Sequence, residues 1–264
     1  MTQSERRLYL IRRLADERHE AVTVPTEEQV QKHLLRALFN VRPPKPCDTE
    51  FLRVQDEYLK EETRQKGITD ISDLMPMCPD IYLWQGDITT LRCDAIVNAA
   101  NSALLGCFCP NHGCIDNSIH TLAGVQLRLA CAELMAKQGH DEPTGQAKIT
   151  PAFNLPCLYV LHTVGPIVSR RLTKRDCELL RSCYLSCLAL TDEKQLESIA
   201  FCCISTGEFH FPNEKAAEIA IRTVKDYKKE TKSEIKVIFD VWKNEDYEIY
   251  NRLLSSDPKA ENRT

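Results

Sequence analysis

The residues between Cys107 and Cys114 concentrate side chains that bind metals. The stretch "GCFCPNHGC" holds three cysteines and one histidine and follows the apolar run "CDAIVNAA". Thiolates and imidazoles are borderline-soft donors that suit zinc. Cys107, His112 and Cys114 alone would leave one position of a zinc tetrahedron open for water or substrate, as in catalytic sites. Cys109 could instead complete the tetrahedron, and the site would then be structural.

A second stretch, "CISTGEFHFP", has the composition of an anion-binding loop. Ser205, Thr206 and Gly207 follow an apolar run and precede a helical pattern, so that free backbone N–H groups and two hydroxyls could bind a phosphate. Loops of small residues also occur simply because the chain must turn. Taken singly, the stretch does not decide between these interpretations.

The elements that must position these loops alternate between strands and helices from Ile81 onward. The expected strands are "IYLWQG", "CDAIVNA", "LYVLHTVG", "SIAFCCIS" and "KVIFDVW". The expected helices cover 115–138, 176–190, 213–230 and 244–254. This alternation predicts an α/β sandwich with a largely parallel sheet, whose ligand crevice lies beyond the carboxyl ends of the strands.

The first part of the chain differs in composition and pattern: it is polar, and its apolar residues recur at helical spacing. Helical spacing is expected over 4–19, over 26–40 with Thr26 as the cap, and over 49–66. These helices have too little apolar surface to stand alone. We therefore divide the chain into a helical extension (1–76) packed on the main domain, the main domain (77–258) and a polar tail (259–264).

Composition and charge exclude several classes of function. The chain has 264 residues, a net charge of −4 and a pI of about 6.0, which argues against wrapping nucleic acid or lying on an anionic membrane. No apolar run approaches the ~20 residues that span a bilayer, and the N-terminus is too charged for a secretory signal. An odd number of cysteines, 13, favours a reducing compartment, so that we expect a cytoplasmic protein.

Four strand-end motifs together resemble the macrodomain family. "QGDIT", "DAIVNAAN", "LHTVGP" and "CCISTG" occur in the family's order, and the resemblance covers about Ile81 to Leu254. It implies a three-layer α/β/α fold with a mixed, largely parallel sheet that binds ADP-ribose. The stretch "LLGCFCPNHGCIDNSIH" replaces the usual glycine-rich loop and looks like the zinc-dependent macrodomains of microbes, as does the extension with "NVRPPKP".

This resemblance implies a role for individual residues. Zn²⁺ would be held by Cys107, His112 and Cys114, with Cys109 left out and His120 packed in the core. The adenine would be read by Asp87, with the Ile88 backbone beside it, unless Asp87 is only a solvated turn residue. Trp242 would stack on adenine or pack on the N-terminal helices.

The other implied contacts concern the diphosphate and the riboses. Asn101 would orient the distal ribose, although it could instead cap a turn. The residues assigned to the diphosphate and the ribose wall are Ile115, Asp116 and Asn117 at a helix start, and Ser205, Thr206, Gly207, Glu208 and Phe209 opposite. Asp116 and Asn117 could instead be only the helix N-cap. Asn101 and Asp116 are the residues expected to take part in catalysis.

The function implied by the resemblance is a zinc-dependent hydrolase that removes mono-ADP-ribose from protein side chains, at a glycosidic or an ester bond. The substrate would be an ADP-ribosylated protein, such as a lipoyl-carrier protein modified by a sirtuin-type ADP-ribosyltransferase. The alternative is a non-catalytic module that binds ADP-ribose or a sirtuin product, with a structural zinc. A redox-sensing protein is disfavoured because most of the cysteines lie in apolar runs.

Overall fold

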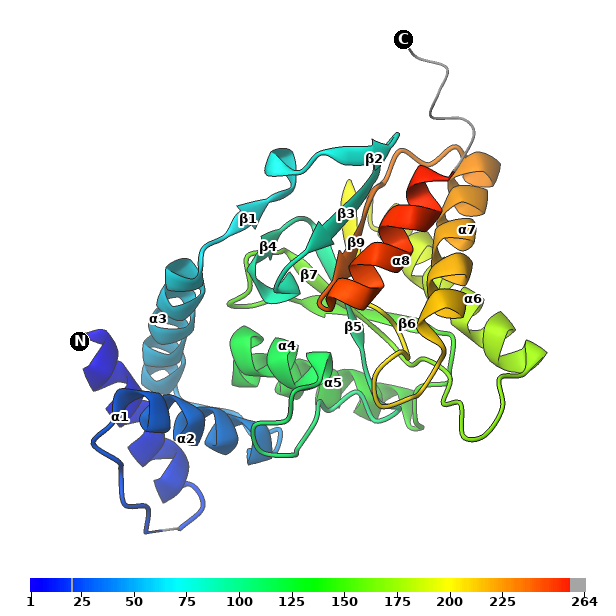
Figure 1. Cartoon of the computed structure of the whole chain (residues 1–264). Helices are drawn as coiled ribbons and strands as arrows, with labels where there is room; N and C mark the ends of the chain where they lie inside the picture. The colour runs from blue at the N-terminus through cyan, green and yellow to red at the C-terminus, as the bar shows by residue number, and fades with distance from the viewer. Residues whose placement is uncertain (20, 257–264) are drawn as a thin grey trace.

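The central element of the protein is a seven-stranded sheet in the order β2-β3-β9-β8-β5-β7-β6 (Figure 1). The computed structural model describes residues 1–19 and 21–256. The strands are β2 (Pro76–Cys78), β3 (Ile81–Gln85), β5 (Ala95–Ala99), β6 (Ala147–Pro151), β7 (Tyr159–Thr163), β8 (Ser198–Phe201) and β9 (Lys236–Val241). The five inner strands are parallel, and β2 and β6 pair antiparallel at the two edges.

Helices cover both faces of this sheet (Figure 1). The helices α4 (Ile115–Ala123) and α5 (Val125–Gln138) lie on one face, and α6 (Lys174–Glu193), α7 (Asn213–Thr231) and α8 (Asn244–Ser255) lie on the other. Because both faces are covered, apolar side chains such as Ile96 and Val97 on β5 are fully buried. The predicted three-layer α/β/α fold with a mixed, largely parallel sheet is thereby confirmed.

Two local expectations were wrong. The single helix expected over 115–138 is divided at Gly124, whose φ of +93° favours glycine and whose Cβ position would collide with the side chains of Gln55, Gln126 and Asn154. Thr26 does not cap the second helix. That helix has Glu27 at its N-cap position, without a side-chain cap hydrogen bond.

The helical extension consists of α1 (Gln3–Asp16), α2 (Glu28–Val41) and α3 (Thr49–Lys66). It has a hydrophobic cluster of its own, which Val125 of α5 joins, and α2 and α3 both contact α4. Arg128 of α5 strengthens this junction, because its guanidinium donates to the carbonyls of Phe39, Asn40 and Arg42. The extension and the sheet domain are therefore held together by both apolar and polar contacts.

Short elements connect the extension to the sheet. After α3 come β1 (Thr69–Asp70), which pairs parallel with β4 (Leu91–Arg92), and the 3₁₀ helix η1 (Ile71–Asp73). The domain boundary at residue 76 stays a prediction, and the predicted tail at 259–264 lies outside the described residues. None of the helices in the described part of the chain has the length and apolarity needed to cross a membrane.

Candidate active site

A cavity of about 1130 Å³ lies at the carboxyl ends of the parallel strands. Residues that follow β3, β5, β8 and β9 line it, because the carboxyl ends of parallel strands meet at one edge of the sheet. A further wall comes from the extension, where Arg36 of α2 and Tyr58, Leu59 and Lys66 of α3 face the cavity. The sequence predicted the crevice but not this contribution of the extension.

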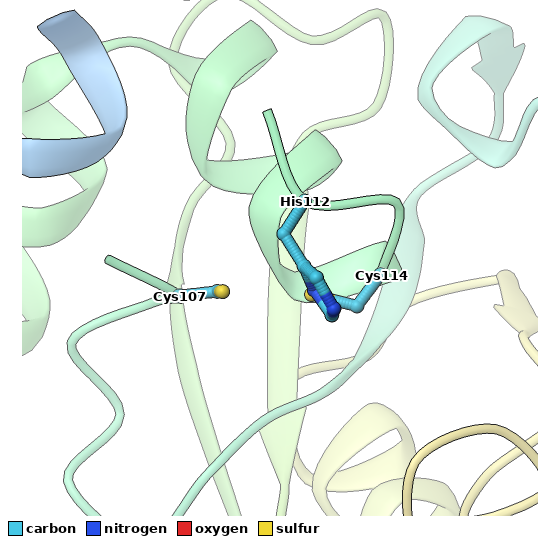
Figure 2. Close-up of side chains that lie close together, drawn as sticks. All are labelled: Cys107, His112 and Cys114. Carbon is cyan, nitrogen blue, oxygen red and sulfur yellow. The ribbon is translucent and has the colours of Figure 1, made fainter. Parts of the chain in front are cut away.

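The three predicted metal ligands lie together at this cavity. Figure 2 shows the side chains of Cys107, His112 and Cys114 directed toward one another, and one ligand atom from each lies within 4.8 Å of the others. They are half-buried, whereas Cys109 is exposed and is not part of the group. The Nδ1 atom of His112 is buried without a hydrogen-bond partner, which leaves a nitrogen lone pair or proton unsatisfied.

The loop with these ligands connects β5 to α4. Cys114 is the N-cap residue of α4, and its Sγ accepts a hydrogen bond from the backbone N–H of Asn117 at 3.4 Å. The interpretation of Asp116 and Asn117 as N-cap residues is therefore wrong. Asn117 is fully buried, and its side chain donates a hydrogen bond to the Cys109 carbonyl of the loop. Asn117 is not among the residues that line the cavity, and its predicted contact with the diphosphate stays a prediction.

Asn101 and Asp116 form a hydrogen-bonded pair on the cavity wall. The Nδ2 of Asn101 donates to the Oδ2 of Asp116 at 3.3 Å and to the carbonyl of Gly106 at 3.1 Å, and the Nδ2 of Asn98 donates to the other oxygen, Oδ1, at 2.8 Å. Burial raises the pKa of Asp116 to about 6, against the opposing effect of the Asn98 hydrogen bond. Asn101 is therefore held in place by a carboxylate and a carbonyl.

Asp87 lies at the opposite end of the cavity, directly after β3. It is the N-cap of the 3₁₀ helix η2 (Ile88–Thr90), accepts from the backbone N–H of Thr89 at 3.1 Å and pairs with Lys66 at 3.0 Å. Burial alone would raise the pKa of Asp87, but the hydrogen bonds from Thr89 and the Lys66 ammonium outweigh it, and the pKa lies below its usual value. Asp87 thus caps a turn with its side chain 31% exposed, its contact with the adenine stays a prediction, and Ile88 beside it is buried on the same wall.

The loop after β8 forms the wall facing the metal-ligand loop. All five residues predicted for this wall line the cavity: Ser205, Thr206, Gly207, Glu208 and Phe209. The helix expected over 213–230 is α7 (Asn213–Thr231), which begins after this loop, so that the N–H groups of Ser205, Thr206 and Gly207 are not those of a helix terminus. Its turn is closed instead by hydrogen bonds from His210 to the Gly207 carbonyl and from Phe211 to the Ser205 carbonyl, both at 3.0 Å.

Ser205 is tightly packed against Gly165 of the loop after β7. Its φ is +66°, a conformation that non-glycine residues adopt mainly where the surroundings enforce it. Its buried Oγ has no hydrogen-bond partner, and a Cβ on Gly165 would lie 2.0 Å from that oxygen. On the other side, the Oε1 of Glu208 lies 3.8 Å from the Nε2 of His112, which is where the two loops meet.

Trp242 and His120 had alternative interpretations. Trp242 lines the cavity with 73% of its surface exposed, so that packing against the N-terminal helices is excluded. His120 is buried beside Cys131 and His162, and the ligand atoms of this second group also lie within 4.8 Å of one another. Both ring nitrogens of His162 are within hydrogen-bond distance of polar neighbours, Asn98 at 3.2 Å and Thr150 at 2.9 Å, whereas both ring nitrogens of His120 are buried without a hydrogen-bond partner.

Comparisons with known proteins agree with this architecture. The Macro domain family model matches residues 97–220. A protein-ADP-ribose hydrolase of Treponema medium is 58% identical over 261 residues, which covers 97% of this chain and 100% of the relative. A second protein-ADP-ribose hydrolase, from Staphylococcus aureus (strain MRSA252), is 51% identical and covers 94% of this chain and 95% of its own.

Solved structures give the same result for the fold. The Trypanosoma brucei macrodomain in complex with ADP-ribose matches with a TM-score of 0.64 at 30% identity, over 83% of this chain and 94% of the other. The Oceanobacillus iheyensis macrodomain with ADP matches with a TM-score of 0.60 at 37% identity, over 66% of this chain and 89% of the other. The second match covers less of this chain, and both structures hold an adenosine diphosphate group.

Proposed function

This chain belongs to the macrodomain family and, within it, to the protein-ADP-ribose hydrolases, and we propose that its hydrolysis of mono-ADP-ribose from modified protein side chains depends on zinc. The observation that carries the proposal is the group of Cys107, His112 and Cys114 on the cavity wall. Two sulfurs and one imidazole are a donor set that binds zinc and leaves one position open.

The residues present fit a zinc ion in chemistry and in surroundings. Their ligand atoms are within 4.8 Å of one another, and the unpartnered Nδ1 of His112 shows that the imidazole has bonding capacity to spare. Cys109 is exposed and outside the group, which supports three protein ligands and not four. Zinc held there would supply Lewis-acid polarisation or lower the pKa of water, and the donor set is compatible with both.

The other residues of the cavity would bind and orient the ligand. Asp87 would accept a hydrogen bond from the adenine amino group, and the loop of Ser205 to Phe209 would hold the diphosphate. Asn101 would orient the distal ribose, and Asp116 would keep the Asn101 amide in place through the hydrogen bond between them. This arrangement would place the anomeric carbon of the distal ribose next to Cys107, His112 and Cys114.

The identity of the modified protein is a further part of the proposal. The resemblance to microbial zinc-dependent macrodomains supports a lipoyl-carrier protein that a sirtuin-type ADP-ribosyltransferase has modified. The bond to be cleaved is a glycosidic or an ester bond to the distal ribose. Release of ADP-ribose from such a carrier, compared with an unrelated ADP-ribosylated protein, would test this preference.

The decisive experiment measures release of ADP-ribose from an auto-modified transferase with and without a zinc chelator. We expect release to stop with the chelator and to return when zinc is added back, with about one zinc per chain in the active protein. Full activity in zinc-free protein would refute the metal requirement. Retention of ADP-ribose binding with no release under any condition would favour a non-catalytic binding module with a structural zinc.

A further inference from the structure

The loop with the three metal ligands is contacted by a side chain from the helical extension. Arg36, on α2, donates from its Nη2 to the carbonyl oxygen of His112 at 2.9 Å. The same nitrogen donates to the Oδ1 of Asn117 at 2.9 Å, and the Nε donates to this oxygen at 3.2 Å. A guanidinium is rigid and planar. By donating to both acceptors, Arg36 therefore fixes the position of the His112 carbonyl relative to the Asn117 side chain.

Asn117 extends this contact to the rest of the loop. Its Nδ2 donates to the carbonyl of Cys109 at 3.0 Å and to that of Cys107 at 3.4 Å. Its backbone N–H donates to the Sγ of Cys114. One buried asparagine thus contacts both ends of the ligand loop, and its remaining acceptor is taken by Arg36.

A second contact from α2 reinforces the first. The Oδ1 of Asn40, one turn after Arg36, accepts a hydrogen bond from the backbone N–H of Asn111 at 2.9 Å, and its Nδ2 donates to Thr121 on α4. Asn111 has a φ of +55° and directly precedes His112. The extension therefore holds the peptide before Asn111 and the peptide after His112, on either side of these two residues.

We propose that Arg36 is a positioning residue for the metal site, and that the extension serves to hold Cys107, His112 and Cys114 at the spacing that binds zinc. This inference rests on the proposed zinc dependence. Arg36 touches none of the three ligand atoms: its hydrogen bonds run to the main-chain carbonyl of His112, to Asn117 and to the Oγ of Ser118. Removing it would leave all three ligands present but would free the loop to adopt other spacings.

The test is zinc affinity of the full chain, measured by competition with a chromophoric chelator in the absence of nucleotide. We expect Arg36→Ala to bind zinc about 10–100-fold more weakly, the usual effect of removing a side chain that orients metal ligands. Arg36→Lys should be intermediate, because an ammonium keeps the charge but cannot form the fork. Arg6→Ala is the matched control, since the guanidinium of Arg6 bonds to Glu57 and Gln3 within the extension, and its zinc affinity should equal that of the wild type.

Hydrogen exchange of the metal-free proteins separates this inference from the proposed function. In Arg36→Ala the amides of residues 107–114 should exchange faster than in the wild type, whereas those of the sheet should not change. If Arg36→Ala does not fold, Arg36→Lys provides the same comparison. Unchanged zinc affinity together with unchanged exchange in a folded variant would overturn the role of Arg36.

If the wild-type protein binds no zinc, the proposed metal requirement is wrong, but the exchange data still test the role of Arg36. Faster exchange of residues 107–114 in Arg36→Ala would still support positioning of the loop by Arg36, and equal exchange would overturn it.

Discussion

Substitution of Asp87 tests whether this carboxylate reads the adenine. Asp87→Asn keeps one acceptor oxygen for Thr89, so that η2 should retain its cap, but it removes the charged acceptor offered to the adenine amino group. A hydrogen bond to a charged group contributes about 1.5–3 kcal/mol. The Asp87 side chain is 31% exposed and already paired with Lys66, which favours the lower half of this range and a loss of about 10- to 40-fold in affinity for ADP-ribose. Titration calorimetry measures this loss, and zinc content should not change.

The neighbouring Lys66 provides the control for this prediction. Lys66→Gln breaks the same ion pair but leaves the carboxylate free to accept from adenine, so that affinity should stay the same or rise. Because the pKa of Asp87 is lowered, its contribution to binding should be constant at neutral pH and be lost only as the pH falls below the ordinary aspartate pKa of about 3.9. Unchanged affinity in Asp87→Asn, or an equal loss in Lys66→Gln, would remove Asp87 from the adenine site.

Four other substitutions test the metal loop, the facing loop and the junction with the extension. His112→Ala should lose zinc and hydrolysis but keep part of its ADP-ribose affinity, whereas Cys109→Ser should keep both zinc and hydrolysis; loss of zinc in Cys109→Ser would indicate four ligands. Gly165→Ala should displace Ser205, whose Oγ would lie 2.0 Å from the new Cβ. This overpacking should lower the free energy of unfolding by about 1–3 kcal/mol and weaken ADP-ribose binding in calorimetry, with wild-type stability and affinity as the contrary result. Arg128→Leu leaves several buried carbonyls without a donor and should lower the free energy of unfolding by about 2–4 kcal/mol in urea titrations; an unchanged midpoint would contradict this.

The sheet and its helices could be predicted because their signals are local. Apolar runs such as "DAIVNA" are typical of strands buried on both faces, and the expected helix over 49–66 has the bounds of α3. The antiparallel edge strand β6 was missed because "AKITP" is partly polar and ends in proline. The break at Gly124 was missed because the helical pattern continues across it, and the need for glycine there comes from its φ of +93° and from the close side chains of Gln55, Gln126 and Asn154.

The candidate site was predictable to the extent that its residues follow strands. Asp87, Asn101 and Ser205 each come shortly after a parallel strand, and the topology then brings them to one cavity. Arg36 was not predictable, because one more arginine on a charged amphipathic helix has no distinguishing spacing. Asn98 did carry a signal: it is a polar residue inside an apolar strand, and buried polar groups need a partner, which here is Asp116.

The order of the strands sets the order in which the predicted site residues follow one another along the edge of the sheet. Along the carboxyl edge of the sheet the neighbours are β3, β9, β8 and β5, followed respectively by Asp87, Trp242, the loop that begins with Ser205, and Asn101 with the metal loop. Three interstrand spacings of about 4.8 Å separate the first strand of this row from the last by about 14 Å. A ligand whose adenine lies at Asp87 and whose diphosphate lies at the loop after β8 must therefore place its distal ribose at β5. A ligand that ends at the diphosphate would fill the row only as far as β8 and leave Cys107, His112 and Cys114 uncovered, so that the proposed chemistry would be directed at a substituent of the distal ribose.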